Sequence, residues 1–246
     1  MQGVILAAGK GTRLRPLTDS RPKPLVEVGG KPLLTHSLER LVSMGVDEVV
    51  VVIGYEGAKI VDRYGEAFEG TPLTYAYQEE RKGLAHATLV AEEHVEGPFV
   101  LTYADVLFEE DVSHCLEYHR ETDPAATLLV TDVPRPEAQR SGVIVTDEED
   151  RVVRSVEKPD DPPTTLALPG LFVFDPIVFD ACRLVTPSDR GEYELPDAFD
   201  LLAYAGHRVE YTETEGWRVN VNTQEDREQA ERYLVQSQEQ PPAGTD

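Results

Sequence analysis

The feature that most constrains this chain is an apolar, strand-like run that leads directly into a glycine-rich basic loop. Residues 3–7 read Gly-Val-Ile-Leu-Ala, and Gly9 and Gly11 follow. Positions 10–31 hold six basic and two acidic residues, a local net charge of +4 in a chain whose net charge is −23. The basic residues are Lys10, Arg13, Arg15, Arg21, Lys23 and Lys31. Such a loop indicates an anionic partner, since small residues let backbone N–H groups approach phosphates closely.

Two common phosphate-binding motifs do not fit this loop. A Walker A loop needs Gly-Lys-Ser/Thr, but Lys10 is followed by Gly11. A dinucleotide-binding fingerprint needs a third small residue where Leu14 stands. Neither motif therefore accounts for this loop.

The run from Gly3 to Leu34 resembles the signature of the sugar-1-phosphate nucleotidyltransferases. It reads Leu-Ala-Ala-Gly-x-Gly-Thr-Arg-Leu-x-Pro-Leu-Thr from Leu6 and continues with Pro-Lys-Pro around Lys23. These enzymes join an NTP and a sugar 1-phosphate into an NDP-sugar and release pyrophosphate. Within the family, the chain is most similar to archaeal glucose-1-phosphate uridylyl- and thymidylyltransferases. The open alternatives are a mannose-1-phosphate guanylyltransferase, a GlcNAc-1-phosphate uridylyltransferase and a non-catalytic paralogue that binds an NDP-sugar and regulates a partner.

Composition limits the partners and the cellular location. The net charge of −23 argues against nucleic acid as a ligand. No apolar run reaches about 18 residues, so no membrane span is expected. The chain begins with a strand rather than a secretory signal, and its two cysteines, Cys115 and Cys182, form no CxxC pattern. We therefore expect a cytoplasmic protein. The resemblance also allows a homo-oligomer, because members of the family often form dimers or tetramers.

The balance of charged residues is typical of proteins from salt-loving microbes. Only six lysines accompany 17 arginines and 46 carboxylates. A carboxylate-rich surface keeps a fold soluble where salt screens its self-repulsion. An ordinary acidic bacterial protein is the alternative.

The pattern of apolar residues predicts an α/β fold with a mostly parallel central sheet and helices on both faces. The resemblance implies that this is the Rossmann-like nucleotidyltransferase fold. We expect a nucleotide-binding half at about 1–125 and a smaller mixed sugar-binding half at about 126–235, packed as one domain, with a disordered tail at 236–246. The expected strands are 3–7, 48–53, 73–77, 99–103, 126–132, 142–146, 151–156, 171–175 and 208–212. The expected helices are 34–45, 58–64, 84–94, 176–184, 195–205 and 224–236.

The resemblance implies a nucleotide site in the first half. The residues assigned to it are Leu6, Ala8, Gly9, Gly11, Thr12, Gln78 and Gly83. In the family a Gln, with a Gly five residues later, recognises the base edge, and Gln78 and Gly83 match that spacing. An amide offers both a donor and an acceptor to a base, and glycine allows close approach of its backbone.

The resemblance also implies which side chains carry the reaction. Arg13 would reach the leaving phosphates, and Lys23 would neutralise the phosphates where the two substrates meet. Asp105, at the end of the strand 99–103, would hold Mg²⁺, the expected cofactor. The family has Gly-Asp-Asn there, whereas this chain has Ala104 and Val106 on either side of the aspartate.

Three segments of the second half match the sugar-binding elements of the family. Gly142 stands in the family's Tyr-Gly-Val element, where Ser141 replaces the aromatic residue. Glu157 and Lys158 form its Glu-Lys-Pro element, in which Glu binds sugar hydroxyls and Lys the sugar phosphate. Gly170 begins a segment that lines the sugar. The run Arg190-Gly191-Glu192-Tyr193-Glu194 also resembles a family segment, but its role cannot be assigned from the sequence.

The main departure from the family lies after Trp217. A second metal-binding aspartate usually follows this tryptophan, and Asn220 takes its position here. An asparagine carbonyl can bind Mg²⁺ but contributes no charge. We therefore expect Asp105 and Asn220 to hold the metal, with weaker affinity than two carboxylates.

Overall fold

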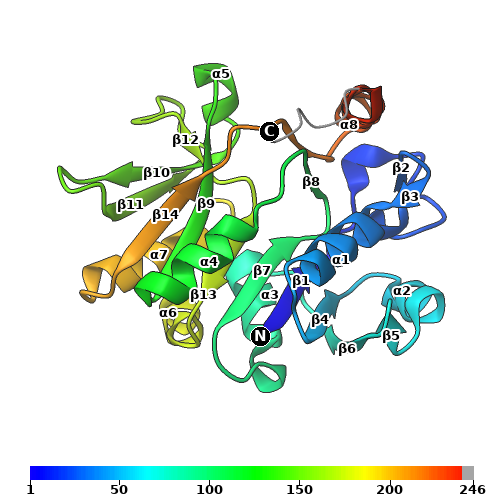
Figure 1. The fold of residues 1–246 in the computed structure, drawn as a ribbon, viewed down its shortest axis with the longest axis horizontal. Helices are drawn as coiled ribbons and strands as arrows, with labels where there is room; N and C mark the ends of the chain where they lie inside the picture. The colour runs from blue at the N-terminus through cyan, green and yellow to red at the C-terminus, as the bar shows by residue number, and fades with distance from the viewer. Residues whose placement is uncertain (240–246) are drawn as a thin grey trace, which may run out of the picture.

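A computed structural model describes residues 1–239, and residues 240–246 lie outside the described part. The first half forms four parallel strands in the order β6-β4-β1-β7, with β5 added antiparallel at the edge (Figure 1). The strands are β1 (Gln2–Leu6), β4 (Glu48–Ile53), β5 (Ala67–Phe68), β6 (Thr71–Tyr77) and β7 (Phe99–Tyr103). All four parallel strands were predicted from their apolar runs.

The second half continues the same sheet with mixed pairing. Strand β13 pairs antiparallel with both β7 and β9, and β14 pairs parallel with β9. Beyond β9 follow β12, β10 and β11, all antiparallel. These strands are β9 (Ala126–Asp132), β10 (Gly142–Thr146), β11 (Val152–Glu157), β12 (Leu166–Ala167), β13 (Leu171–Phe174) and β14 (Val209–Glu213). One sheet thus runs through both predicted halves.

Helices cover both faces of the sheet because the strands are apolar on both sides. In β1, Val4 and Leu6 belong to one buried cluster, and Ile5 belongs to the other. Helices α3, α6 and α7 pack on the first face, and α1, α2 and α4 on the second (Figure 1). The helices are α1 (Leu33–Ser43), α2 (Gly57–Tyr64), α3 (Leu84–Val90), α4 (Ser113–Thr122), α5 (Arg135–Ala138), α6 (Ile177–Leu184), α7 (Leu195–Tyr204) and α8 (Gln224–Glu239).

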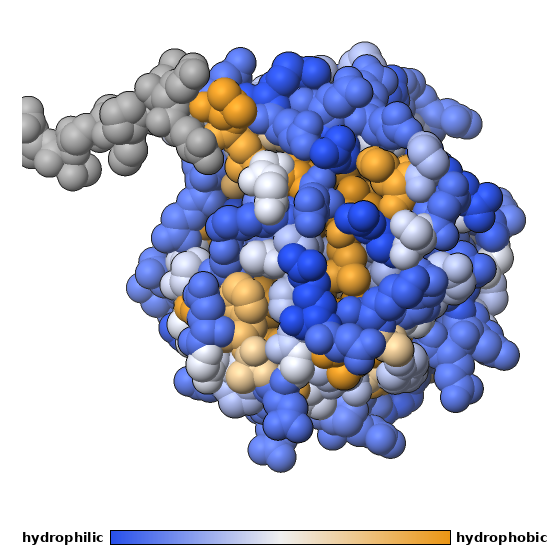
Figure 2. All heavy atoms as spheres, turned by 90° about the vertical axis from the view of Figure 1, so that its right-hand side faces the viewer, coloured by the Kyte–Doolittle hydropathy of each residue, from blue (hydrophilic) through white to orange (hydrophobic). Residues whose placement is uncertain are grey.

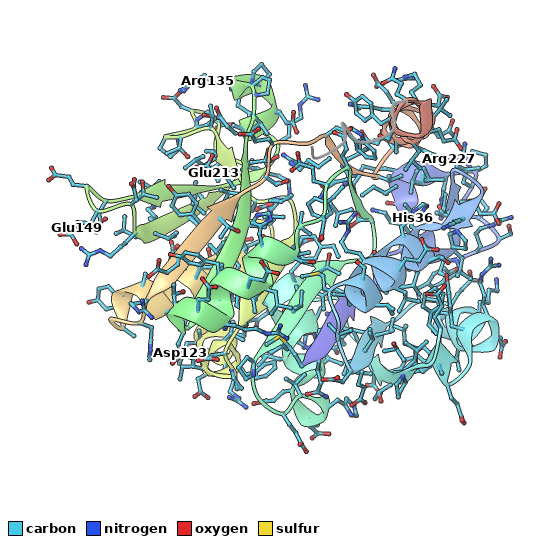
Figure 3. The ribbon with its side chains drawn as sticks, in the orientation of Figure 1. His36, Asp123, Arg135, Glu149, Glu213 and Arg227 are labelled. Atoms are coloured by element: carbon cyan, nitrogen blue, oxygen red, sulfur yellow. The ribbon has the colours of Figure 1, made fainter. Side chains whose placement is uncertain are left out.

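Short elements connect the nucleotide half to the C-terminal helix. Strand β8 (Val106–Phe108) pairs antiparallel with β15 (Arg218–Asn220), and β2 (Glu27–Val28) pairs with β3 (Lys31–Pro32). Arg227 of α8 donates a 2.8 Å hydrogen bond to the backbone oxygen of Glu27, so α8 docks beside β2 (Figure 3). Three single turns of 3-10 helix complete the chain: η1 (Thr12–Leu14), η2 (Lys23–Leu25) and η3 (Glu92–His94).

The structure differs from the sequence prediction at three helices, and the short elements β2, β3, β5, β8, β12, β15 and α5 were not predicted. Helix α4 was not predicted, because only Cys115, Leu116 and His119 of its ten residues are buried and the apolar stripe is weak. The helix expected over 84–94 ends at Val90 and gives way to η3. The disordered tail was expected to begin at residue 236, but α8 continues to Glu239. The rest of the expected tail, residues 240–246, lies outside the described residues.

One face of the molecule is strongly hydrophilic. Figure 2 shows that the face at the right of Figure 1 is covered mainly by hydrophilic residues, with apolar patches visible between them. Within residues 1–239, no helix is both long enough and apolar enough to cross a bilayer.

Candidate active site

A cavity of about 1030 Å³ opens where the parallel strands end at their carboxyl termini. Leu6 ends β1, Gln78 follows β6, and Asp105 follows β7. This is the edge at which open α/β sheets bind ligands. Most of the predicted site residues line this one cavity: Leu6, Ala8, Gly9, Arg13, Lys23, Gln78, Gly83, Asp105, Gly142, Glu157, Lys158 and Asn220.

At one end of the cavity, the amide of Gln78 is held by two acceptors. Its Nε2 donates to the backbone oxygen of Gly83 at 3.3 Å and lies 3.0 Å from Nδ1 of His86. Gly83 has φ +111, and a Cβ there would lie 2.5 Å from the backbone oxygen of Tyr193. Gly83 therefore satisfies both a backbone and a packing requirement that other residues cannot meet.

The centre of the cavity holds a buried lysine between two oxygen atoms that accept its hydrogen bonds. Lys23, whose side chain is 10% exposed, forms an ion pair with Asp105. Its Nζ also donates a 3.0 Å hydrogen bond to Oδ1 of Asn222, which accepts a second one of 3.1 Å from Arg13. Both predicted phosphate-binding cations thus meet at one oxygen.

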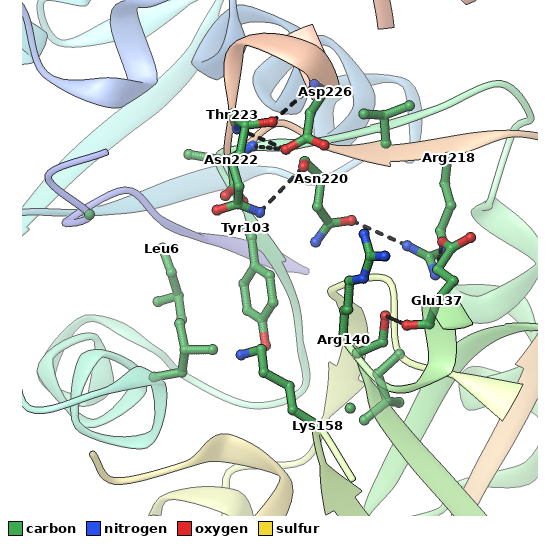
Figure 4. Close-up of a pocket in the computed structure, with 18 of the residues that line it drawn as sticks. Leu6, Tyr103, Glu137, Arg140, Lys158, Arg218, Asn220, Asn222, Thr223 and Asp226 are labelled. Carbon is green, nitrogen blue, oxygen red and sulfur yellow. Dashed lines mark hydrogen bonds and ion pairs between the residues drawn. The ribbon is translucent and has the colours of Figure 1, made fainter. Parts of the chain in front are cut away.

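Asn222 contacts this cluster, whereas the sequence analysis predicted Asn220 as the second metal ligand. The Nδ2 of Asn220 donates to the backbone oxygen of Pro169 at 3.2 Å, and its Oδ1 faces Arg218 (Figure 4). Asp226, at the start of α8, accepts hydrogen bonds from the backbone N–H groups of Asn222 and Thr223. The sequence Asn-Thr-x-x-Asp at residues 222–226 is typical of the start of a helix, where an acidic side chain accepts hydrogen bonds from free backbone N–H groups.

Three predicted residues, Gly11, Thr12 and Gly170, do not line the cavity. A Cβ on Gly11 would come within 2.8 Å of Cβ of Lys23, so Gly11 makes room for the stem of that lysine. Thr12 is exposed in η1. Gly170, with φ +106, packs against the ring of Tyr103, which itself lines the cavity. Burial, with nearby carboxylates, raises the pKa of Tyr103 well above its usual value.

The predicted sugar residues gather at the other end of the cavity. Lys158 adopts a left-handed conformation with φ +49 and places its Nζ 2.5 Å from Oε1 of Glu157. The N–H of Lys158 donates to the backbone oxygen of Ser141 at 3.0 Å. A Cβ on Gly142 would lie 2.9 Å from Oε2 of Glu157. A non-glycine residue at positive φ beside a cavity is a feature often found at functional sites.

A family profile described as nucleotidyl transferase matches residues 2–238. The chain belongs to the nucleotidyl transferase family. The UTP–glucose-1-phosphate uridylyltransferase AglF of Haloferax volcanii is 45% identical over 234 residues, which cover 95% of this chain and 96% of AglF. The low-salt glycan biosynthesis nucleotidyltransferase Agl11 of the same organism is 36% identical and covers 100% of this chain and 69% of Agl11.

Solved structures confirm the predicted fold of this nucleotidyl transferase. A crystal structure from Bacillus anthracis, assigned as a glucose-1-phosphate thymidylyltransferase, has a TM-score of 0.86 and 27% identity and covers 99% of this chain and 98% of that one. The relatives from Haloferax also fit the carboxylate-rich composition, which predicted a halophilic protein.

The run of residues 190–194, whose role could not be assigned from the sequence, contacts both the segment after Gln78 and Glu157. Arg190 donates a 2.7 Å hydrogen bond to Glu194 and lies 3.4 Å from Oε1 of Glu157. The backbone of Tyr193 donates to the oxygen of Lys82 and accepts from the N–H of Ala85. This nucleotidyl transferase therefore links its Gln78–Gly83 loop to Glu157 through a single short segment.

A divalent cation fits the centre of the cavity by the chemistry of its donors. Members of the family generally use divalent cations. The ammonium of Lys23 stands between oxygens of Asp105 and Asn222, where positive charge is evidently stabilised. Residues 1–239 contain no cluster of three His, Cys, Asp or Glu side chains that could hold a metal without substrate. One carboxylate and one amide suit Mg²⁺, which usually takes most of its ligands from substrate phosphates and water.

Proposed function

We propose that this chain transfers a nucleotidyl group from UTP or dTTP to glucose 1-phosphate and releases pyrophosphate, with Mg²⁺ as cofactor. The observation that carries the proposal is the cavity itself, which has Gln78 at one end, Glu157 and Lys158 at the other, and Lys23 with Asp105 between them. The similarity to AglF over almost the whole of both chains supports these substrates.

In the proposed reaction, an oxygen of the sugar 1-phosphate forms a bond to the α-phosphorus of the NTP. The bond from that phosphorus to the bridging oxygen breaks, and pyrophosphate leaves with the electron pair. Two anions must meet, so the protein has to supply positive charge at the point of contact. Lys23 and Arg13 supply it from the nucleotide half, and Lys158 supplies it from the sugar half.

The metal would be held by Asp105 with help from an asparagine oxygen. The contacts of Asn222 with Lys23 and Arg13 favour this residue over Asn220 for that role. Bound Mg²⁺ would add positive charge at the phosphate oxygens of the substrate. Because Lys23 already pairs with Asp105, it would share that carboxylate with the cation and would add its own positive charge beside the phosphates.

The base would be read by the free edge of Gln78. Since Nε2 is directed at Gly83 and His86, Oε1 is left for a base N–H. Uracil, thymine and guanine each present such an N–H, so Gln78 alone does not choose among them. Small residues at Ala8 and Gly9 leave room for the nucleoside beside it.

The direct test is a grid of pyrophosphate-release assays at molar KCl with Mg²⁺. UTP, dTTP, GTP, CTP and ATP are each paired with the 1-phosphates of glucose, mannose, galactose and GlcNAc. We expect the UTP or dTTP row with glucose 1-phosphate to dominate. A dominant GTP–mannose signal would instead identify a mannose-1-phosphate guanylyltransferase, and UTP with GlcNAc 1-phosphate a different uridylyltransferase.

A non-catalytic NDP-sugar-binding paralogue is the remaining alternative. Four residues around the site depart from the family pattern: Ala104, Val106, Ser141 and Asn220. Against it, the cations and the carboxylate at the centre are all kept and face one cavity. Arg13→Ala separates the two, because it should abolish turnover and largely spare NDP-sugar binding in an enzyme. We place the reaction in the cytoplasm and assign no nucleic acid or membrane partner.

A further inference from the structure

A buried arginine beside the sugar end of the cavity has donors that no described residue accepts. Arg218, on β15, lines the cavity, and its side chain is only 8% exposed. Its Nε and Nη2 atoms are shielded from solvent and have no hydrogen-bond acceptor. A guanidinium carries five N–H donors and stays charged, so burying it without acceptors is unfavourable.

One carboxylate lies close to Arg218 but does not satisfy it. Oε1 of Glu137, on α5, is 3.0 Å from Nη2 of Arg218, yet the N–H bonds are not directed at that oxygen. Nη1 has only a 3.5 Å contact with Oδ1 of Asn220. Desolvation lowers the pKa of Arg218, and the charge of Glu137 opposes this only in part.

A second arginine points into the same space. Arg140, just after α5, extends its guanidinium toward that of Arg218, beside the amide of Asn220 (Figure 4). Both arginines line the cavity. Two like charges that converge on one solvent-filled space repel each other unless an anion lies between them. Together with Glu137, the cluster has a net charge of +1.

This cluster adjoins the residues proposed to bind the sugar. Arg140 is followed directly by Ser141, whose backbone oxygen accepts the hydrogen bond from Lys158. Gly142, next in sequence, lies against the carboxylate of Glu157. The arginines therefore stand next to the residues proposed to bind the sugar 1-phosphate, in the same cavity.

We propose that Arg218 and Arg140 form a subsite for a carboxylate carried by the sugar, so that the enzyme accepts a uronic acid 1-phosphate as well as the neutral sugar phosphate. The proposal rests on the function proposed above and extends its substrate class. The planar fork of Arg218 suits a carboxylate, which accepts two parallel hydrogen bonds. The net charge of +1 in the cluster of Arg218, Arg140 and Glu137 suits a carboxylate better than a second phosphate, which carries more negative charge.

The test compares two acceptor substrates, glucose 1-phosphate and glucuronic acid 1-phosphate, with the same NTP. For the wild type we expect kcat/KM for the uronic acid to lie within about tenfold of that for glucose. We define the ratio as kcat/KM for glucuronic acid 1-phosphate divided by kcat/KM for glucose 1-phosphate. Arg218→Met should lower this ratio by roughly tenfold or more, because only the uronic acid loses charge-assisted hydrogen bonds. Glu137→Gln should raise the ratio, since it frees the guanidinium of a competing carboxylate.

The controls separate this subsite from a general effect of losing an arginine. Arg81 lines the cavity near Gln78, so Arg81→Met should leave the ratio unchanged. Glu137→Gln keeps the proposal testable if Arg218→Met fails to fold. Binding of UDP-glucuronate and UDP-glucose to the same variants gives the ratio without turnover.

Three results would overturn the proposal. The first is that the wild type neither turns over nor binds the uronic acid substrate. The second is that the ratio is the same in the wild type and in Arg218→Met. The third is that Glu137→Gln leaves the ratio unchanged. If Arg218 instead binds a neutral hydroxyl group of the sugar, Arg218→Met would lower kcat/KM equally for both sugar phosphates. Absence of turnover with every sugar 1-phosphate would instead contradict the proposed function. The relative affinities for UDP-glucuronate and UDP-glucose would still test the carboxylate subsite in that case.

Discussion

Gln78 and His86 are joined by a hydrogen bond of 3.0 Å whose direction is set by a third group. The same Nε2 of Gln78 lies 3.3 Å from the backbone oxygen of Gly83, which can only accept. The group facing both neighbours is therefore the NH₂ of the amide, and Nδ1 of His86 is an unprotonated acceptor. Burial, and then the charge of Lys82, lower the pKa of His86, which keeps the ring neutral.

Acidification should therefore weaken nucleotide binding. Below the lowered pKa of His86, Nδ1 gains a proton, the acceptor for Gln78 is lost, and KM for the NTP should rise as pH falls from about 7 to about 5. Stability should fall in the same direction, because the unfolded chain takes up this proton at the ordinary pKa of 6.5, before the folded one does. KM measured across this range checks the prediction.

His86→Asn is the informative variant, since its Oδ1 takes the place of Nδ1 and accepts at every pH. His86→Asn should therefore remove the part of the pH dependence of KM for the NTP that comes from protonation of His86. His114→Gln is the control, because His114 contacts only the backbone oxygen of Glu213 on the surface and does not line the cavity. A pH profile of His86→Asn identical to that of the wild type would show that His86 does not govern Gln78.

Loss of the ammonium at the centre of the cavity should remove most of the activity. Lys23→Met takes away the charge that faces both substrates, and we expect kcat to fall by roughly 10²–10³. Lys31→Met is the control, because Lys31 pairs with Glu39 on the surface and should change stability by less than about 1 kcal/mol. Pyrophosphate release and thermal unfolding of both variants check this. An active Lys23→Met enzyme would contradict the proposed role.

The sequence predicted the sheet well because its signal is local. Runs such as residues 49–53 within β4 are apolar throughout, as strands covered on both faces must be. Asp105 was placed correctly at the edge of the cavity because it directly follows such a strand. Helix α4 was missed because its buried side is narrow and includes a histidine, which an apolar pattern does not count.

The asparagine that contacts Lys23 and Arg13 is Asn222 and not the predicted Asn220, and the difference has a physical reason. Which of Asn220 and Asn222 reaches Asp105 depends on the pairing of β15 with β8, in which Asn220 lies opposite Val106. That register joins segments more than 100 residues apart, and no local pattern encodes it. The burial of Arg218 likewise depends on where α5 lies, so the sequence alone gave no sign of it.

Substituting each asparagine by aspartate should distinguish the two candidate metal ligands. Asn222→Asp adds a charge beside Asp105 and should lower the Mg²⁺ concentration needed for half-maximal activity. Asn220→Asp adds the same charge where the side chain contacts Pro169 and Arg218, and the Mg²⁺ requirement should stay nearly unchanged. Titrations of activity with Mg²⁺ measure both. The reverse pattern would restore Asn220 as the ligand.

The acidic surface should make stability depend on salt. With a net charge of −23, self-repulsion destabilises the compact state at low ionic strength. Side chains such as Glu149, at the tip of the β10–β11 hairpin, point away from the core into solvent (Figure 3). Tm should rise between about 0.1 M and about 1 M KCl, as the Debye length falls from about 10 Å to about 3 Å. A Tm that does not change over this range would contradict the prediction.

Two glycines allow the cost of backbone strain to be separated from the cost of crowding at the nucleotide site. Gly83 and Gly97 have φ +111 and +92, so alanine is strained at both. A Cβ at Gly97 meets nothing within 4 Å, whereas one at Gly83 would lie 2.6 Å from the nitrogen of Tyr193. Gly97→Ala should therefore cost only the strain, about 1–3 kcal/mol of unfolding free energy, with KM for the NTP unchanged.

Gly83→Ala should cost more, because the strand-like contact between residues 82–85 and Tyr193 has to open. Tyr193 donates to Lys82 at 2.7 Å and accepts from Ala85 at 3.0 Å, and neither hydrogen bond survives a shift that relieves the clash. Gln78 loses its acceptor at Gly83 in the same movement, so KM for the NTP should rise together with the loss of stability. Equal effects of the two substitutions on both unfolding and KM would show that Tyr193 does not hold the base-binding loop in place.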